Sequence, residues 1–284
     1  MKIRSNAKLN LFLKVFGKSG NLHKLESLMV PINLYDYIEI KESDEDKIIG
    51  MDIPNEQNLM FKALCKVRSL YDINKHIEIV IEKNIPVFAG LGGGSSNAAS
   101  VILALNEMWK LNMSNDEMIS IGKQIGSDVP FFIINKPAFV FGTGDKIIEN
   151  NEFSKIKGIL VFDDNKASTK EVFERLDALP IARNNRINKS LDKIYENANE
   201  DLRSVCNSIH NIEYINDLEK GLDLIMYSKI QSIKNDLMSH GAVYSLMTGS
   251  GGCVFGIFEN DVDVEMCRKV LSDKYKFVYC FESI

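Results

Sequence analysis

The first third of the chain is dominated by alternation of apolar and polar residues. At residues 8–15 every second position is Leu or Val, which is the period of a β-strand. This period places Lys8 and Asn10 together on the face opposite Leu9 and Leu11. Further strands are predicted at residues 35–40, 47–53 and 77–81.

Other segments carry apolar residues at steps of three and four, the spacing of an amphipathic helix. Helices are predicted at residues 58–70, 96–108, 115–125, 169–179, 230–238 and 264–271, and the polar stretch 188–206 is also predicted as helical. Beyond residue 136, strands are predicted at residues 137–141, 158–162, 242–247, 253–258 and 277–281.

The pattern starts afresh after a polar stretch at residues 149–152. Its last section has the strand–strand–helix–strand order of a small α+β layer. The sequence therefore predicts two domains, residues 1–156 and 157–284.

Composition limits the classes of partner. Of the 284 residues, 45% are hydrophobic and 26% are charged, as in an ordinary globular protein, and the formal net charge of −5 provides no general attraction for nucleic acid. No signal peptide or membrane-spanning apolar run is found, so no membrane contact is expected.

The five cysteines are scattered and form no Cys-x-x-Cys pair, which favours reduced thiols in the cytoplasm. A monomer and a homodimer are both compatible with the sequence.

The most informative stretch is a glycine-rich run between the strand at 77–81 and the helix at 96–108. It consists of Gly90, Leu91, Gly92, Gly93, Gly94, Ser95, Ser96 and Asn97. Glycine lets a ligand approach the main chain, and a helix start presents N–H groups and partial positive charge, so a phosphate chain is the natural ligand. The serine hydroxyls could also help to hold Mg²⁺. The run is neither a Walker A motif nor a dinucleotide fingerprint, and the alternative is a flexible surface turn.

Pro86-x-x-x-Gly90-Leu91-Gly92 followed by serines resembles the central motif of the GHMP kinases, which include galactokinase, homoserine kinase, mevalonate kinase and phosphomevalonate kinase. Segments 7–13, 92–99, 126–132 and 247–255 are similar, in the same order, to motifs of the 4-diphosphocytidyl-2-C-methyl-D-erythritol kinases. The resemblance implies an α+β fold with two domains. These are an N-terminal ribosomal-protein-S5-like α/β domain that binds ATP and a C-terminal ferredoxin-like α+β domain, with the active site in the cleft between them.

The resemblance also implies a reaction, the transfer of the γ-phosphate of ATP, accompanied by Mg²⁺, to the 2-hydroxyl of the cytidylyl substrate. Asp128 matches the catalytic base, and Lys8 matches the lysine that keeps this base ionised and neutralises the transferring phosphoryl group. Without the resemblance, Asp128 would be interpreted as an aspartate in a turn and Lys8 as a solvated lysine on a strand. No metal-ligand set is found, because His76, His210 and His240 lack the spacing for one.

The same correspondence assigns further positions. On the nucleotide side are Lys83, which would pack on adenine, Pro86, Asn58 and the glycine-rich run. On the acceptor side are Asn10, His23, Phe173, Thr169 and Gly249. Asn21 and Leu22 stand where the family has glycine and a stacking tyrosine. This departure leaves open a kinase of the mevalonate or homoserine type, and a non-catalytic nucleotide-binding relative is the third alternative.

Overall fold

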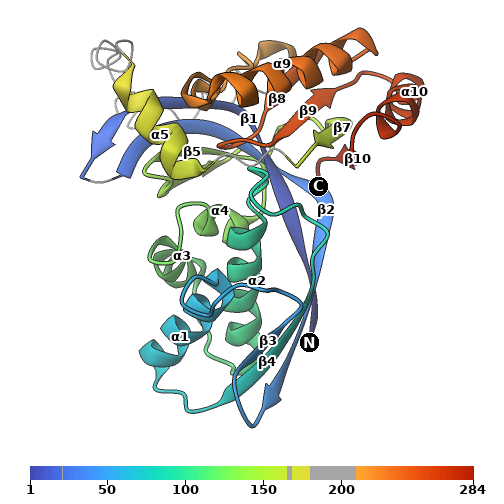
Figure 1. The fold of residues 1–284 in the computed structure, drawn as a ribbon. Coiled ribbons are helices and arrows are strands. Elements are labelled where there is room, and N and C mark those ends of the chain that lie inside the picture. The colour runs from blue at the N-terminus through green and yellow to red at the C-terminus, as the bar shows by residue number, and fades with distance from the viewer. Residues whose placement is uncertain (21, 165–167, 180–208) are drawn as a thin grey trace. The chain divides into compact units, whose positions relative to one another are not determined.

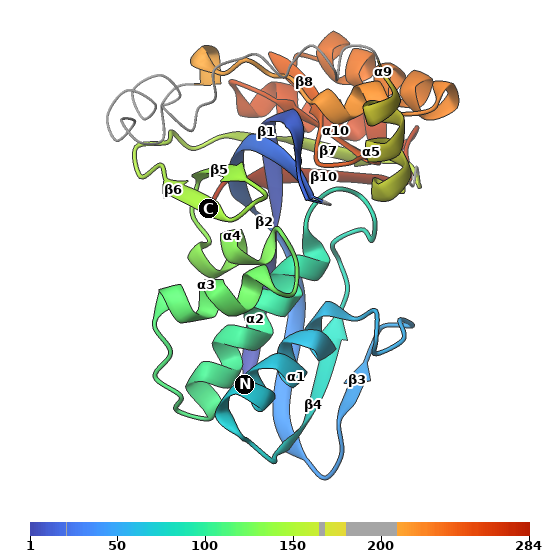
Figure 2. The same ribbon diagram turned by 90° about the vertical axis from the view of Figure 1, so that its left-hand side faces the viewer.

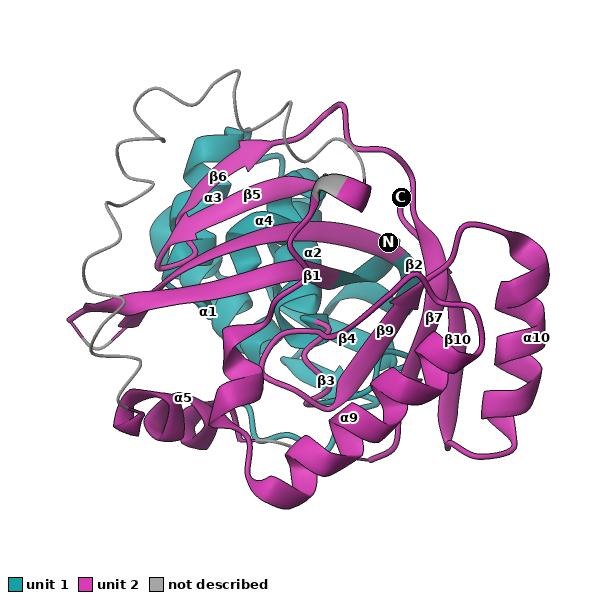
Figure 3. Ribbon diagram, turned by 90° about the horizontal axis from the view of Figure 1, so that it is seen from above, with its two compact units in different colours: residues 1–8, 33–87, 92–136 teal, residues 9–32, 88–91, 137–284 magenta. Residues whose placement is uncertain are grey.

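The structure is a computed structural model that describes residues 1–20, 22–164, 168–179 and 209–284. Asn21 and the helix predicted at 188–206 lie outside the described residues. The chain forms two compact units (Figure 3), unit 1 with Met1–Lys8, Asn33–Val87 and Gly92–Lys136, and unit 2 with Leu9–Ile32, Phe88–Leu91 and Pro137–Ile284. The long strands β1 (Lys2–Ser19) and β2 (Leu22–Ser43) each contribute residues to both units. The boundary at residues 156/157 stays a prediction.

Unit 1 is a layer of strands covered by helices. Its remaining elements are β3 (Lys47–Ile49), β4 (His76–Glu82), α1 (Leu59–Tyr71), α2 (Gly93–Met108), α3 (Asn115–Lys123) and α4 (Val129–Ile134). β4 pairs antiparallel with β2 and parallel with β3. Figures 1 and 2 show the four helices on one side of these strands. Their core includes the fully buried Ile40, Ile79 and Leu105.

Unit 2 contains two sets of paired strands. The first joins β5 (Ala138–Gly142) to β2 and to β6 (Lys146–Glu149). The second is a four-stranded antiparallel sheet of β7 (Lys157–Phe162), β8 (Tyr244–Met247), β9 (Cys253–Ile257) and β10 (Phe277–Glu282), in the order β10-β7-β9-β8.

Helices α9 (Leu224–Ser239) and α10 (Asp261–Ser272) cover one face of the four-stranded sheet (Figure 3). Buried side chains such as Ile159, Ile233 and Leu271 join both layers in one core. The chain order β7-α9-β8-β9-α10-β10 is that of a ferredoxin-like unit. The predicted α+β fold class is confirmed. Unit 2 also includes α5 (Thr169–Ala178) and two short 3-10 helices, Ile209–Asn211 and Asp217–Gly221.

Several elements differ from the sequence-based prediction. β2 is far longer than residues 35–40, since residues 26–32 are buried on both faces and show no alternation. Helix α4 and strand β6 were not predicted, because six and four residues are too short for a periodic pattern. The strand predicted at 47–53 ends at Ile49, where its pairing with β4 ends. Within the described residues no helix is long and apolar enough to cross a membrane.

A bidentate ion pair fixes one end of the layer in unit 1. Asp46, between β2 and β3, accepts hydrogen bonds from Arg68 Nη1 and Nη2 of α1 at 2.7 and 2.8 Å. It also accepts the N–H of Ile77, at the start of β4, at 3.1 Å. The bonds from Arg68, against the opposing effect of burial, lower the pKa of Asp46 from 3.8 to about 2.

We therefore predict a pH-dependent stability contribution. Because the folded pKa of Asp46 lies below the unfolded one, the contribution is complete above pH ~4 and is lost as the pH falls towards 2. Asp46→Asn should lower the free energy of unfolding at pH 7 by about 2 kcal/mol and by much less near pH 2. Urea unfolding at several pH values measures this, and curves that stay parallel down to pH 2 would contradict it. Glu265→Gln, which removes the exposed pair with Arg268, should change nothing measurable.

Candidate active site

The start of α2 carries most of the glycine-rich run. The helix begins at Gly93, so residues predicted as loop form its first turn. The first hydrogen bond joins the N–H of Ser96 to the carbonyl of Gly92 at 2.9 Å. The preceding amides of Gly93, Gly94 and Ser95 have no acceptor within the helix. Three main-chain donors and the positive end of the helix dipole therefore point out of one helix end, which favours an anionic ligand.

Gly92 caps this helix in a conformation and a space that only glycine allows. Its φ is +73°, in the left-handed region. A methyl group there would lie 2.8 Å from the Phe132 ring of α4 and 3.1 Å from Lys8 Cγ of β1. The backbone at the helix start is thus packed directly against the side chain of Lys8.

Lys8 and Asp128 lie together beside that helix start. Lys8 Nζ is 4.0 Å from Asp128 Oδ2, an ion-pair distance that is too long for a hydrogen bond. The Lys8 side chain is 3% exposed and that of Asp128, directly before α4, is 32% exposed. A methyl group on Gly126 would lie 3.8 Å from Ser95 Oγ, so the segment leading to Asp128 also flanks α2. Unit 1 therefore brings together the predicted catalytic pair and the amides of α2.

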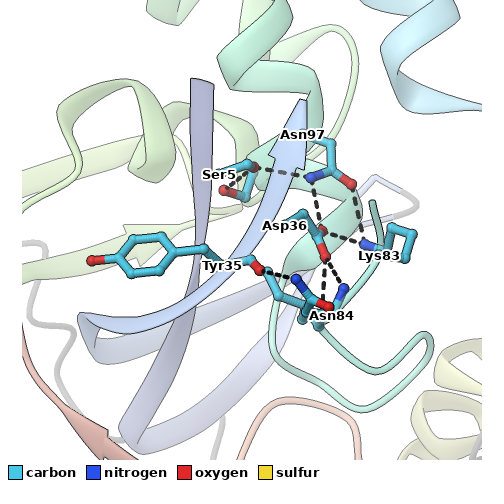
Figure 4. A network of polar contacts seen from close by, with 8 residues as sticks. Ser5, Tyr35, Asp36, Lys83, Asn84 and Asn97 are labelled. Carbon is cyan, nitrogen blue, oxygen red and sulfur yellow. Dashed lines mark hydrogen bonds and ion pairs between the residues drawn. The ribbon is translucent and has the colours of Figure 1, made fainter. Parts of the chain in front are cut away.

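A second group of polar residues connects the first turns of α2 to strands β1 and β2 (Figure 4). The Ser96 hydroxyl accepts a hydrogen bond from Ser5 at 2.8 Å, and Asn97 Nδ2 donates to Ser5 at 3.0 Å and to Asp36 at 2.9 Å. Lys83 forms an ion pair with Asp36 and donates to Asn97 Oδ1 at 3.2 Å. The side chains of Ser96, Asn97 and Lys83 thus bind within the protein. Sequence reasoning missed Asp36, which takes an inward position in the alternating series that includes Leu34 and Ile38.

Asn58 is the N-cap residue of α1. Its Oδ1 accepts the N–H of Met60 at 2.9 Å, whereas its Nδ2 is buried without a hydrogen-bond partner among the described residues. The next residue, Leu59, has Cδ1 3.8 Å from where a methyl group on Gly94 would lie. Asn58 is therefore close to the start of α2 and has one buried donor without a partner among the described residues.

The predicted acceptor-side residues lie in unit 2, where Gly90 packs against the loop after β8. With φ at +79°, a methyl group on Gly90 would lie 2.1 Å from the carbonyl oxygen of Thr248. The Asn10 N–H donates to Thr248 Oγ1 at 3.1 Å. Asn216 donates to the carbonyl of Gly249 at 2.8 Å, and Thr169 shares a 2.7 Å hydrogen bond with Ser250 in the same loop.

His23 and Phe173 form a stacked pair in unit 2, with ring centroids 4.3 Å apart and planes at 21°. His23 Nε2 lies 2.9 Å from Asp177 Oδ1, and Lys18 Nζ lies 2.5 Å from Asp177 Oδ2. Burial acts to raise the pKa of Asp177, but the bonds from Lys18 and His23 outweigh burial and lower it. The side chain of Leu22, at the position of the family tyrosine, is largely exposed. His23 and Phe173, both predicted on the acceptor side, thus contact each other, and Asp177, which was not predicted, bonds to His23.

Comparison with known proteins shows the family of the chain. The GHMP kinases N terminal domain matches residues 58–136, and the GHMP kinases C terminal family matches residues 189–276. A 4-diphosphocytidyl-2-C-methyl-D-erythritol kinase of Clostridioides difficile is 40% identical, over 100% of this chain and 95% of that protein. The protein of that name from Syntrophus aciditrophicus is 38% identical, over 100% of this chain and 99% of that protein.

The chain belongs to the 4-diphosphocytidyl-2-C-methyl-D-erythritol kinase family of the GHMP kinases. The resemblance seen in the sequence is confirmed. A crystal structure of 4-(cytidine 5'-diphospho)-2C-methyl-D-erythritol kinase shares the fold, with a TM-score of 0.78, 23% identity and coverage of 100% of this chain and 99% of that one. The mevalonate kinase of Methanococcus jannaschii follows with a TM-score of 0.66, 18% identity and coverage of 100% and 98%. A GHMP kinase uses ATP.

We predict that Gly92→Ala impairs this GHMP kinase more than backbone strain alone would. The methyl group has to displace Phe132 or Lys8, which should reduce ATP turnover by about 100-fold or more and cost about 1–3 kcal/mol of stability. Gly17→Ala is the matched control, because Gly17 has a φ of +79° with nothing within 4 Å of the added methyl group. Steady-state turnover and thermal unfolding of both variants check this, and equal effects would contradict it.

Proposed function

We propose that the protein transfers the γ-phosphate of ATP to the 2-hydroxyl of 4-diphosphocytidyl-2-C-methyl-D-erythritol. The observation that carries this proposal is the placement of Lys8 and Asp128, 4.0 Å apart, beside the amides that begin α2. Phosphoryl transfer requires positioning and charge stabilisation rather than covalent chemistry from the protein, and this cluster offers both. The family to which the chain belongs supports the choice of acceptor.

The amides of Gly93, Gly94 and Ser95 bind the phosphate chain of ATP. Their N–H groups lie in one helix turn and have no competing acceptor in the helix. We assign Asn58, which caps α1 beside the start of α2, to the nucleotide side. Lys83 and Pro86 belong to the segment before the glycine-rich run, which we assign to the adenine side.

Asp128 accepts the proton of the acceptor hydroxyl as the oxygen attacks the γ-phosphorus and ADP leaves. Its carboxylate is partly exposed, so a hydroxyl can reach it. Lys8, whose side chain is buried, holds the carboxylate in place and stabilises the negative charge on the transferring group. One buried cation thus serves both the base and the phosphoryl group.

Mg²⁺ is the ion we propose to accompany ATP. Among the described residues no group of three or more His, Cys, Asp or Glu could hold a metal ion, and Mg²⁺ is commonly bound by one or two carboxylates plus substrate phosphates. The Ser95 hydroxyl is an oxygen donor in the first turn of α2 and fits a supporting role beside the substrate phosphates. When bound, the ion supplies neutralisation of phosphate charge.

The acceptor is recognised by residues of unit 2. Phe173 and His23 offer aromatic faces to the cytosine ring. Asn10, Thr169 and Gly249 orient the alcohol group that receives the phosphate. The exposed Leu22 offers no ring, so we assign stacking to Phe173 and His23. We propose that the reaction takes place in the cytoplasm, with small molecules as partners, no nucleic acid or membrane, and a monomeric or homodimeric enzyme.

The general-base assignment predicts a separation of binding from chemistry. Asp128→Asn keeps the size of the side chain but cannot accept the proton, so kcat should fall by about 1,000-fold while ATP affinity changes little. A coupled assay for ADP with the cytidylyl substrate, together with calorimetric titration of ATP, measures both. Wild-type turnover with mevalonate or homoserine in place of the cytidylyl substrate would instead favour the alternative acceptors.

The stacked pair makes an independent prediction about the acceptor. Phe173→Leu removes an aromatic face, so KM for the cytidylyl substrate should rise by about tenfold while KM for ATP stays the same. Tyr214→Leu is the control, because it removes a comparable stack with Tyr244, whose centroid is 4.1 Å away. The assignment fails if the two variants shift KM for the cytidylyl substrate equally.

A further inference from the structure

Asp36 carries a carboxylate with no exposed surface, in the middle of β2. Its Oδ1 accepts the main-chain N–H groups of Asn84 and Ile85, each at 2.9 Å. Its Oδ2 accepts Asn97 Nδ2 at 2.9 Å and forms the ion pair with Lys83. A buried carboxylate is costly unless it is paired and hydrogen-bonded, and both oxygens of Asp36 are satisfied.

The donors that meet at Asp36 come from both ends of the stretch 83–97, which contains the glycine-rich run (Figure 4). Lys83, Asn84 and Ile85 directly follow β4 and precede Pro86, whereas Asn97 is the fifth residue of α2. The two ends also touch, because a methyl group on Gly93 would lie 3.0 Å from Ile85 Cγ2 and 3.2 Å from Lys83 Nζ. One carboxylate therefore fixes where the segment leaves β4 and where it enters the helix.

Asp36 also determines the surroundings of Lys83. The Lys83 side chain is 15% exposed, and its ammonium contacts both Asp36 and Asn97. The carboxylate of Asp36 neutralises the positive charge of Lys83 within unit 1, next to the first residue of α2. The orientation of the first α2 amides thus depends on a network of side chains that lies behind them.

We propose that Asp36 is a positioning residue of the nucleotide site, which holds the Lys83–Ile85 segment and Asn97 so that the first amides of α2 converge on the phosphates. The inference rests on the proposed use of these amides to bind ATP. Asp36 acts through main-chain and side-chain donors, and ATP affinity is the property that it controls.

The test compares Asp36→Asn with Asp46→Asn. The carboxamide at residue 36 has one accepting atom instead of two, and it leaves Lys83 without its counter-ion. Asp46 is also part of an ion pair in unit 1, but it bonds to Ile77 near the start of β4, whereas Asp36 bonds to residues beyond its end. We expect Kd for a non-hydrolysable ATP analogue to rise about tenfold in Asp36→Asn and to change less than about twofold in Asp46→Asn.

Steady-state kinetics and a second variant complete the test. KM for ATP should rise with Kd in Asp36→Asn, while KM for the cytidylyl substrate stays within about twofold of wild type. Asn97→Ala removes one donor to Asp36 and should weaken ATP binding in the same direction, so it serves if Asp36→Asn does not fold. A folded Asp36→Asn with unchanged or tighter analogue binding, or an unchanged Asn97→Ala when that variant stands in, would overturn the inference. If wild type binds the analogue but phosphorylates no cytidylyl substrate, the proposed function fails, while the comparison of Kd values still decides the role of Asp36.

Discussion

The packing of Gly92 against Lys8 and Phe132 is the constraint on which the proposed catalytic arrangement depends. It sets the start of α2 against the aliphatic part of the buried Lys8 side chain, whose ammonium lies 4.0 Å from the carboxylate of Asp128, directly before α4. Strand β1, the N-cap of α2 and helix α4 thus pack together at Gly92.

Behind this contact, unit 1 uses polar side chains as internal ties. Asp36 and Ser5 connect β2 and β1 to the first turns of α2, while Asp46 connects α1 to the start of β4 at the other end of the layer. Unit 2 uses a related device, in which Asn10 and Asn216 hold the loop after β8 by hydrogen bonds to Thr248 and Gly249. In both units, buried polar groups fix the loops, and apolar layers supply most of the stability.

Sequence periodicity predicted the helices with long amphipathic patterns and the alternating strands. It failed for the part of β2 at residues 26–32, which is buried on both faces, and for α4, which has only six residues, all of them apolar. The glycine-rich run, Lys8 and Asp128 could be found because the family motifs name them. Asp36 could have been found as an isolated carboxylate at an inward position of a strand. Asp177 could not, since it lies 154 residues from His23 in the chain and only folding brings them together.

The stack of His23 on Phe173 has a consequence for ligand entry. A planar base inserted between two rings needs centroids about 7 Å apart, whereas these rings are 4.3 Å apart. In the proposed acceptor site, a pyrimidine has to bind on an outer face of the pair or to exchange one protein–protein stack for two protein–ligand stacks. In the second case the intrinsic attraction of the rings for each other is subtracted from the binding free energy. This loss is the same for every planar ligand, so it lowers the affinity for all of them without changing the selectivity among them.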